Sequence, residues 1–533
     1  MAAPSCILYR NNESTVFLID IPTSIALAQH LPSPSLSSLE TGSTSQDTTA
    51  APPHRKQLYS TPALTTPFPS PPEPKSDAAR ARLLARIPVS ERRFHEGIVP
   101  FVRQGLEEIG DRFEGVSAGA EREKRMWCLP RKVIQGEEPT KTIFSAEEST
   151  FDYEADSGPP AKQARTSVRM GSDDGCHITR PSLDVARESK VDASGAGDGI
   201  ADSRPGPPLI LSPTVNEFES LSELRNVEVR NPSSKPAVIR AHCPATAEES
   251  TRQDYTTFNI PPESCFVLCE LSSQPCSHSP IPGLPENRKF NLILLDPPWP
   301  NRSVRRAAKY ATHPPFDMDG LSRMIRDIIL RHLHDGRSTD PIEDRPDDQQ
   351  SQPSIVAIWV TNKEKSRVAA YDAIRGAGLS VCEEWVWIKT TIEGEPVTPL
   401  EGLWRKPYEV LVIGKRDENR DDNRSTSTYT MGRGTPNERS GSPQRRLIAG
   451  VPDVHSRKPN LKEIFETVFF SPSSIAADAP AMKDDTDTSP QQERRRRTKY
   501  SALEVFARNL TAGWCACGDE ALKFNCDEWW VEE

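Results

Sequence analysis

From residue 290 onward, continuous apolar runs alternate with segments of helical spacing, and this alternation restricts the fold more than any other feature. The expected strands are residues 291–295, 354–362, 382–390, 407–415 and 502–508, and residues 292–295 form a continuous apolar run. Runs without polar alternation are typical of strands buried on both faces of a parallel sheet. Helical spacing of apolar residues is found in 321–333, 366–378 and 461–470. The pattern predicts an α/β fold with a doubly wound sheet, whose ligands bind beyond the carboxyl ends of the strands.

The sequence before this region has a different composition. The chain of 533 residues contains 50 prolines, its mean hydropathy is −0.59, and eight of its nine tryptophans lie at or beyond Trp299. Long stretches with this much proline cannot bury a core. We therefore expect a short strand segment at 1–30, a disordered segment at 31–76, a helical segment at 77–134, a disordered linker at 135–205 and the folded domain at 206–533. Polar composition predicts disordered surface insertions in that domain at 335–352, 416–446 and 471–499.

Several classes of protein are excluded by simple counts. The chain has no run of eighteen apolar residues, so we expect no membrane-spanning helix. Arg10 and Glu13 interrupt the apolar N-terminal stretch, which argues against a secretory signal. Eleven scattered cysteines then indicate reduced thiols in a soluble intracellular chain. The net charge of −10 gives no sign of a globally basic nucleic-acid binder, although a local basic groove would suffice for binding.

The motif Asp296-Pro297-Pro298-Trp299 follows the buried run 291–295 directly. Two prolines can simply mark a turn after a strand. The position at a strand's carboxyl end instead favours an active site. The residue types suit the methylation of an amine on an aromatic base, which is a poor nucleophile because its lone pair is conjugated with the ring. The Asp296 carboxylate and the Pro297 carbonyl can each accept one N–H of that amine, the prolines fix the backbone, and Trp299 offers a stacking face.

The motif and its surroundings resemble the adenine N(6)-methyltransferases of the MT-A70 family. The string DPPWPNRSVRRAAKY at 296–310 is similar to the methyltransferase-like four branch. Further similar strings follow in order at 357–367, 383–415, 455–465 and 503–525, so the resemblance covers residues 205–533. The opening ILYRNNESTVFLIDIPTS is similar to fungal members. The resemblance implies a Rossmann-like domain that depends on S-adenosylmethionine.

The resemblance also implies a cofactor site at one edge of the sheet. Lys406 resembles the lysine that meets the methionine carboxylate of the cofactor. The other implied cofactor contacts are Glu270, Leu271, Glu504, Arg508, Asn509, Asp519 and Glu520. The family commonly has Asn where this chain has Asp519, so its hydrogen-bond donors toward adenine differ. A surface lysine and a plain strand end are the alternatives for Lys406 and for Glu270 with Leu271.

Basic and polar residues near the motif are expected to bind the substrate. Those that follow the motif are Asn301, Ser303, Arg305, Arg306, Lys309 and Tyr310. A second set, His455, Arg457 and Lys458, lies in a string similar to the family's His-Ser-x-Lys-Pro loop, which implies phosphate-facing or cofactor-facing roles. A solvated basic loop is the alternative. The run Arg494–Arg497 is interpreted as a loop flank, a nuclear-import signal or a nucleic-acid contact.

Two other kinds of site are not expected. Cys515, Cys517 and Cys526 have no common zinc-finger spacing and lack a fourth ligand, so we predict no metal. A Gly-rich loop after a strand is also missing, which argues against a nicotinamide enzyme.

The sequence thus predicts a monomeric nuclear enzyme that transfers methyl from S-adenosylmethionine to the N(6) amine of adenine in nucleic acid. RNA of the small nuclear type is favoured over DNA, because the branch resemblance points to it. The alternatives are a DNA N(6)-adenine methyltransferase, a non-catalytic nucleic-acid-binding subunit of the same fold, and a small-molecule amine methyltransferase.

Overall fold

The computed structural model describes fourteen parts of the chain, and every structural statement below concerns them. They are residues 4–30, 56–69, 74, 76–114, 127–134, 206–242, 255–271, 279–300, 317–335, 352–403, 405–416, 442–454, 457–471 and 500–532. The predicted linker at 135–205 lies wholly outside them, as does most of each of the three predicted insertions.

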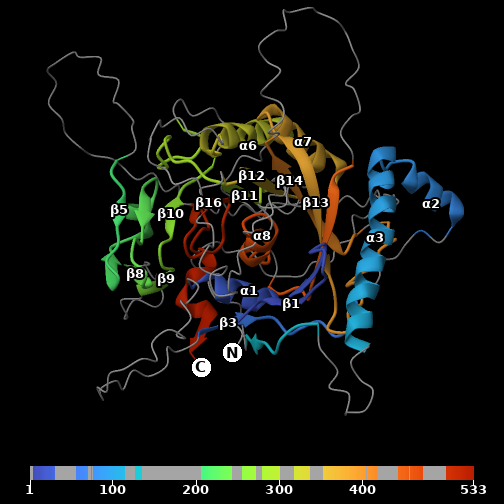
Figure 1. Ribbon diagram of the computed structural model, residues 1–533, viewed down its shortest axis with the longest axis horizontal. Coiled ribbons are helices and arrows are strands. Elements are labelled where there is room, and N and C mark those ends of the chain that lie inside the picture. Colours follow the sequence, from blue (N-terminus) through green and yellow to red (C-terminus); the bar gives the residue numbers. More distant parts are fainter. Residues whose placement is uncertain are drawn as a thin grey trace, which may run out of the picture. The chain divides into compact units, whose positions relative to one another are not determined.

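A sheet of 12 strands forms the centre of the fold (Figure 1). In order across the sheet they are β1 (Ile7–Arg10), β2 (Val16–Ile19), β15 (Gln444–Gly450), β13 (Ser380–Lys389), β14 (Tyr408–Lys415), β12 (Ile355–Val360), β11 (Leu292–Leu295), β16 (Ala502–Val505), β17 (Cys515–Gly518), β10 (Cys265–Leu268), β7 (Glu228–Arg230) and β5 (Leu209–Ile210). Neighbours are parallel except where β1, β14 and the β7–β5 pair run against the rest. The sheet confirms the predicted α/β class.

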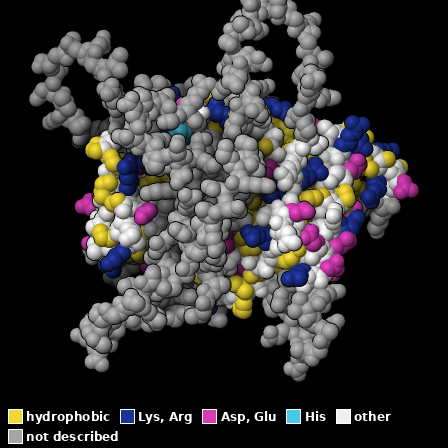
Figure 2. Space-filling model, in the orientation of Figure 1, with side chains coloured by type: hydrophobic (Ala, Val, Ile, Leu, Met, Phe, Trp, Pro, Cys, Tyr) yellow, Lys and Arg dark blue, Asp and Glu magenta, His cyan; other side chains and the backbone are white. Residues whose placement is uncertain are grey.

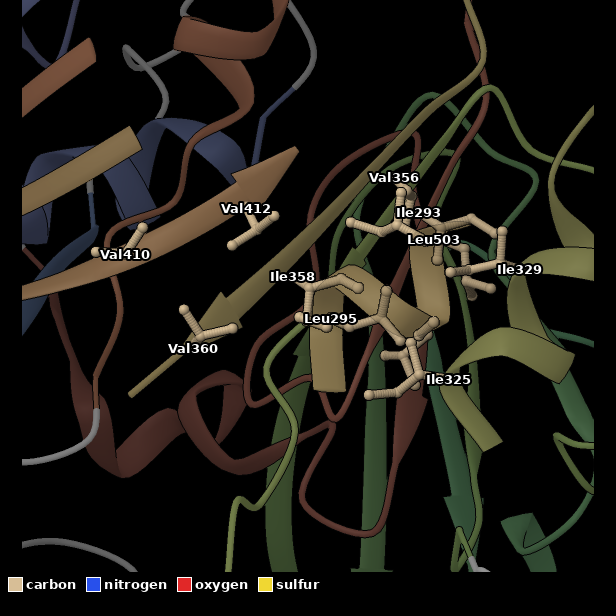
Figure 3. Close-up of a cluster of buried hydrophobic side chains, with 14 of the residues drawn as sticks. Ile293, Leu295, Ile325, Ile329, Val356, Ile358, Val360, Val410, Val412 and Leu503 are labelled. Atoms are coloured by element: carbon tan, nitrogen blue, oxygen red, sulfur yellow. The ribbon is translucent and has the colours of Figure 1, made fainter. Parts of the chain in front are cut away.

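Helices cover both faces of this sheet. One face carries α3 (Val89–Glu114), α6 (Met318–His332) and α7 (Glu364–Gly376), and the other carries α1 (Ile21–Ala28) and α8 (Lys462–Val468). Side chains alternate along β11, so that Ile293 and Leu295 join one core while Leu292 and Leu294 join the other. Figure 3 shows Ile325 and Ile329 of α6 against the first of these cores. The predicted burial of 291–295 on both faces is therefore confirmed.

Two smaller sheets and three short helices complete the described fold. The sheets contain β6 (Val215–Phe218), β8 (Ala237–His242) and β9 (Tyr255–Ile260), and β18 (Trp530–Glu532), β3 (Lys56–Ser60) and β4 (Lys132–Val133). The short 3-10 helices are η1 (Leu221–Leu224), η3 (Lys523–Asn525) and η4 (Asp527–Trp529). Among the described residues, no helix is long and apolar enough to cross a membrane.

The N-terminal part of the chain packs with the domain that we expected at 206–533. The described residues up to 134 belong to the same compact unit as the described residues from 206 onward. The short strand segment expected at 1–30 contains β1 and β2, which pair antiparallel, and β2 extends the central sheet beside β15. Helices α2 (Asp77–Leu84) and α3 lie in the helical segment expected at 77–134, and Val102 and Ile109 of α3 are buried.

Two predicted boundaries are wrong, and one strand of the central sheet was not predicted. Strand β3 lies inside 31–76, which composition had predicted to be disordered, and it is ordered by pairing with β18 and β4. Strand β15 begins inside the predicted insertion 416–446, because its apolar half follows a polar run. Strand β17 was not predicted at all, since its sequence CACG is short and rich in cysteine.

Candidate active site

The carboxyl edge of the central sheet brings the predicted chemistry together. Strands β2, β15, β13, β12, β11, β16, β17 and β10 all run in one direction, so their carboxyl ends share one edge. From β11 the chain leads through α6 to β12 on one side, while β16, on the other side, leads to β17. Such a reversal is a topological switch point, where open α/β sheets bind ligands. Residues 296–299 follow β11 at this point.

Asp296 is fixed by the backbone and by a lysine. Its N–H donates to the Val505 carbonyl at 3.2 Å. Lys458 Nζ lies 3.3 Å from Asp296 Oδ1 and 2.9 Å from Glu409 Oε2. Lys389 Nζ lies 2.6 Å from Glu409 Oε1. The four side chains therefore form a line of alternating charge that ends on the motif aspartate.

The charge states in this line follow from burial and pairing. Burial opposes the charge of Lys458, but the Asp296 and Glu409 carboxylates outweigh it and raise the pKa of Lys458. Burial likewise opposes the charge of Glu409, but Lys389 and Lys458 hold the pKa of Glu409 well below its ordinary value. Both groups are thus charged at neutral pH, and Lys458 serves as an electrostatic partner of Asp296 and not as a base.

Glu504, unlike Glu409, is a neutral carboxyl group at neutral pH. It lies in β16, across from Leu294 of β11. Burial, and then the negative charge of Asp296, raise the pKa of Glu504 from 4.5 to about 8. At neutral pH this carboxyl group carries a proton and can donate a hydrogen bond. Two carboxyl groups at one sheet edge therefore have different electrostatic surroundings, which is common in active sites.

The tetrapeptide is more constrained than its sequence suggests. The Trp299 N–H donates to the Pro297 carbonyl at 2.8 Å, and Trp299 Nε1 donates to the Trp359 carbonyl at 2.7 Å. The first contact occupies one lone pair of the carbonyl that we expected to face the substrate, and it leaves the second for another donor. The second contact fixes the orientation of the half-buried indole ring. Pro298 is exposed.

Lys406 lies at the same edge but makes a different contact from Lys458. It precedes β14, which runs antiparallel to β12 and so begins at the carboxyl edge. Its Nζ donates to the Leu400 carbonyl at 3.3 Å. The lysine that meets the Asp296 carboxylate is Lys458, which the sequence had associated with phosphate or cofactor.

Arg457 does not face a ligand, and this corrects the sequence prediction. Its side chain is 0% exposed and forms an ion pair with Asp453 at 2.6 Å. Its Nη1 also donates to the Tyr59 carbonyl at 2.8 Å. The guanidinium lies 4.4 Å from the Phe524 ring centre and 4.7 Å from that of Trp529. A cation enclosed in this way stabilises the fold and cannot reach a phosphate in solvent.

The other predicted cofactor residues come from the strands beyond β11. Glu270 and Leu271 follow β10, Arg508 and Asn509 follow β16, and Asp519 and Glu520 follow β17, so all lie at the carboxyl edge. Arg508 Nε lies 3.1 Å from Glu520 Oε2, whose other oxygen is 3.2 Å from Lys523 Nζ. Leu271 and Asn509 are buried, whereas Glu270 and Asp519 are exposed.

Several predicted substrate residues lie outside the described parts of the chain. They are Asn301, Ser303, Arg305, Arg306, Lys309, Tyr310 and His455, together with the run Arg494–Arg497. On the face shown in Figure 2, basic and acidic side chains of the described residues are intermixed over the right-hand side of the view.

Glu409 and Lys389 are site residues that the sequence analysis missed. Glu409 interrupts the otherwise apolar strand β14, and a carboxylate in a buried strand requires a charged partner. Lys389 ends the buried strand β13 in the same way. A polar residue inside or at the end of a buried run was therefore the available signal.

The cysteines form a different group from the one considered as zinc ligands. Cys515 faces Cys265 across the β10–β17 pair, and the ligand atoms of these two residues and of Glu228 lie within 4.8 Å of one another. A hydrogen bond with the Cys265 thiol, together with burial, raises the pKa of Cys515 well above its ordinary value. Glu228 is already paired with Arg230 at 2.7 Å and with Arg288 at 3.4 Å. A protonated thiol and a neutralised carboxylate are poor metal ligands.

Comparisons with known proteins agree with this geometry. Residues 290–476 match the MT-A70 family model. The chain is 36% identical over 247 residues to the N6-methyladenosine RNA methyltransferase MTA1 of Cryphonectria parasitica, which covers 46% of this chain and 55% of that protein. It is 28% identical over 274 residues to the N(6)-adenine-specific methyltransferase METTL4 of Homo sapiens, and this match covers 51% of this chain and 44% of that protein. It is 26% identical over 257 residues to a DNA N6-methyl methyltransferase of Caenorhabditis elegans, covering 46% and 54%. The chain thus spans about half the length of these relatives, and its residues 290–476 are similar to the MT-A70 methyltransferase domain.

Proposed function

We propose that this protein transfers a methyl group from S-adenosylmethionine to the N(6) amine of adenine in nucleic acid. The observation that carries the proposal is the position of Asp296-Pro297-Pro298-Trp299 at the switch point of the sheet, with Lys458 beside Asp296. The names of the fungal, human and nematode relatives support the same reaction.

The residues on the β16–β17 side fit S-adenosylmethionine. Among the described residues, the buried amide nitrogen of Asn509 makes no hydrogen bond, so a donor is available to a ligand hydroxyl. Protonated Glu504 offers a second donor, and exposed Asp519 offers acceptors. When bound, the cofactor supplies an electrophilic methyl group. Glu504, Arg508, Asn509, Asp519 and Glu520 would hold it.

The chain's own residues orient the amine and receive its proton. The Asp296 carboxylate and the free lone pair of the Pro297 carbonyl each accept one N–H, which favours localising the nitrogen lone pair. Lys458 keeps the carboxylate in place without being able to take up a proton itself. Once the nitrogen is alkylated its proton becomes acidic, and Asp296 accepts it and passes it to water.

RNA is the substrate that we propose, with DNA as the alternative. The relative with the highest identity quoted above is named as an RNA methyltransferase, whereas the nematode relative is named as a DNA methyltransferase. A non-catalytic nucleic-acid-binding subunit is the candidate from another class, and the intact Asp296 and Trp299 argue against it. We also propose that the protein acts as a monomer in the nucleus, with Arg494–Arg497 as an import signal.

The deciding experiment offers matched RNA and DNA oligonucleotides with labelled cofactor and identifies the product by nucleoside mass spectrometry. Asp296→Asn should abolish transfer and leave cofactor affinity within about an order of magnitude, because the carboxylate acts on the amine. Asp319→Asn, which changes an exposed carboxylate on α6, is the matched control. Binding of both oligonucleotides without any transfer by the native protein would favour the non-catalytic subunit instead.

A further inference from the structure

Segments far from the MT-A70 match contact the part of the chain that carries Lys458. We call residues 451–454 and 457–458 the Lys458 loop. Arg131 Nη2 donates to the Val451 carbonyl at 2.7 Å, and Arg131 Nη1 donates to the Pro452 carbonyl at 2.8 Å. The same Nη1 lies 3.4 Å from the Thr61 carbonyl. One guanidinium thus joins the Lys458 loop to the segment that follows β3.

A second set of contacts joins β3 to the same loop. The Thr61 N–H donates to Asp453 Oδ1 at 2.9 Å. Asp453 is buried and forms the ion pair with Arg457, which in turn donates to the Tyr59 carbonyl. Two positions of the β3 segment, Tyr59 and Thr61, therefore contact Asp453 and Arg457, which lie shortly before Lys458.

Strand β3 and the segment that contains Arg131 are themselves held in place by the rest of the fold. Strand β3 pairs with β18 on one side and with β4 on the other, where Tyr59 is opposite Lys132. Leu58 is buried, and Trp127, four residues before Arg131, is buried against Gly394. The segments that contact the Lys458 loop, residues 56–61 and 127–134, which we call the brace, are therefore packed against the folded core.

We propose that Arg131 is a positioning residue, which sets the Lys458 loop so that Lys458 meets Asp296. The loop needs such a residue because Val451 and Pro452 follow the end of β15 and their carbonyls receive no strand partner there; the bonds that these two carbonyls accept in the described structure come from Arg131. The effect of Arg131 on catalysis rests on the proposed function. Arg131, Tyr59 and Thr61 then support the active site through the Lys458 loop, although none of them lies within residues 290–476.

The test compares three variants of the full chain. Arg131→Ala removes both contacts with the loop, and Arg131→Lys retains the charge but can reach only one carbonyl well. Lys132→Ala is the matched control, since it removes the same charge from an exposed neighbouring side chain. Thermal midpoints identify any variant that fails to fold, in which case Arg131→Lys carries the test.

The first measurement is hydrogen exchange in the peptide that spans residues 442–459. We expect faster exchange in Arg131→Ala, an intermediate rate in Arg131→Lys and no change in Lys132→Ala. Unchanged exchange in Arg131→Ala would overturn the brace. This measurement needs no turnover, so it decides the brace even if the native protein transfers no methyl group, an outcome that would refute the proposed function separately.

The second measurement is a double-mutant cycle with Lys458→Met. Arg131→Ala should lower kcat about tenfold, with the KM for the oligonucleotide unchanged, because two hydrogen bonds to a charged group are lost. In the Lys458→Met background it should cause no further loss, since Arg131 acts through Lys458. Equal losses in both backgrounds, or a raised KM at constant kcat, would overturn the positioning role; the latter would place Arg131 on the nucleic acid.

Discussion

Replacing Glu504 by glutamine should stabilise the ligand-free protein, and the gain should depend on pH. The folded protein holds the pKa of Glu504 at about 8, above the ordinary value of 4.5, because of burial and the negative charge of Asp296. Between these two values the folded state binds more protons than the unfolded state, so this group lowers stability as the pH rises through the window. A glutamine has the same shape and no charge to desolvate.

The size of the effect follows from the same two values. At about 1.4 kcal/mol for each pKa unit, full expression of the difference corresponds to about 4–5 kcal/mol above pH 8. The Glu504 side chain is only half-buried, so water reduces this, and we expect a gain of about 2 kcal/mol. That gain corresponds to roughly 3 °C in the thermal midpoint, because the entropy of unfolding is about 2 cal/mol/K per residue over about 300 ordered residues.

The assay is thermal unfolding of the native protein and of Glu504→Gln between pH 5 and pH 9 without ligand. The two midpoints should nearly coincide at pH 5, separate as the pH rises and stay apart above pH 8. Glu219→Gln, which changes an exposed carboxylate, should follow the native protein at every pH. A separation that does not vary with pH, or a less stable Glu504→Gln at pH 8, would refute the account of this residue.

Three further changes separate the roles of neighbouring residues. Arg457→Ala should lower the free energy of unfolding, measured in urea, by about 3–5 kcal/mol, because it leaves Asp453 buried without its cation. A variant that stays stable but shows a smaller salt dependence of RNA binding would instead assign Arg457 to a phosphate of the substrate. Lys458→Met should reduce kcat at least tenfold more than Lys406→Met, since Lys458 is the one that contacts Asp296, and equal losses in steady-state assays would contradict this assignment. Trp299→Ala should weaken RNA binding by about 1–3 kcal/mol through loss of a stacking face, measured by titration, whereas an effect on cofactor binding alone would assign Trp299 to the other pocket.

The sequence was most informative where local pattern determines structure. Residues 292–295 are apolar without interruption, and they form β11, buried on both faces. The position of Asp296 at the carboxyl edge then follows from the strand's direction. Runs 354–362, 382–390 and 407–415 gave strands β12, β13 and β14 for the same reason. The predictions that failed concern segments whose order depends on distant partners. Strand β3 has a polar sequence between prolines, and it forms because β18 and β4 supply its hydrogen bonds.

Arg457 and Lys458 show why a motif alone could not assign the site. The two cations are adjacent in one similar string, and the resemblance implied that both face a phosphate or the cofactor. In the structure Arg457 points into the interior toward Asp453, while Lys458 extends to Asp296. The difference arises because the Tyr59 carbonyl and the rings of Phe524 and Trp529 enclose the arginine. Those groups come from segments about 400 residues before and about 70 residues after it, so no spacing rule within the loop contains the information. Whether a basic residue binds substrate or stabilises the fold therefore depends on which remote segments cover it. Here the segments that contain Tyr59, Phe524 and Trp529 cover Arg457 and leave Lys458 beside Asp296.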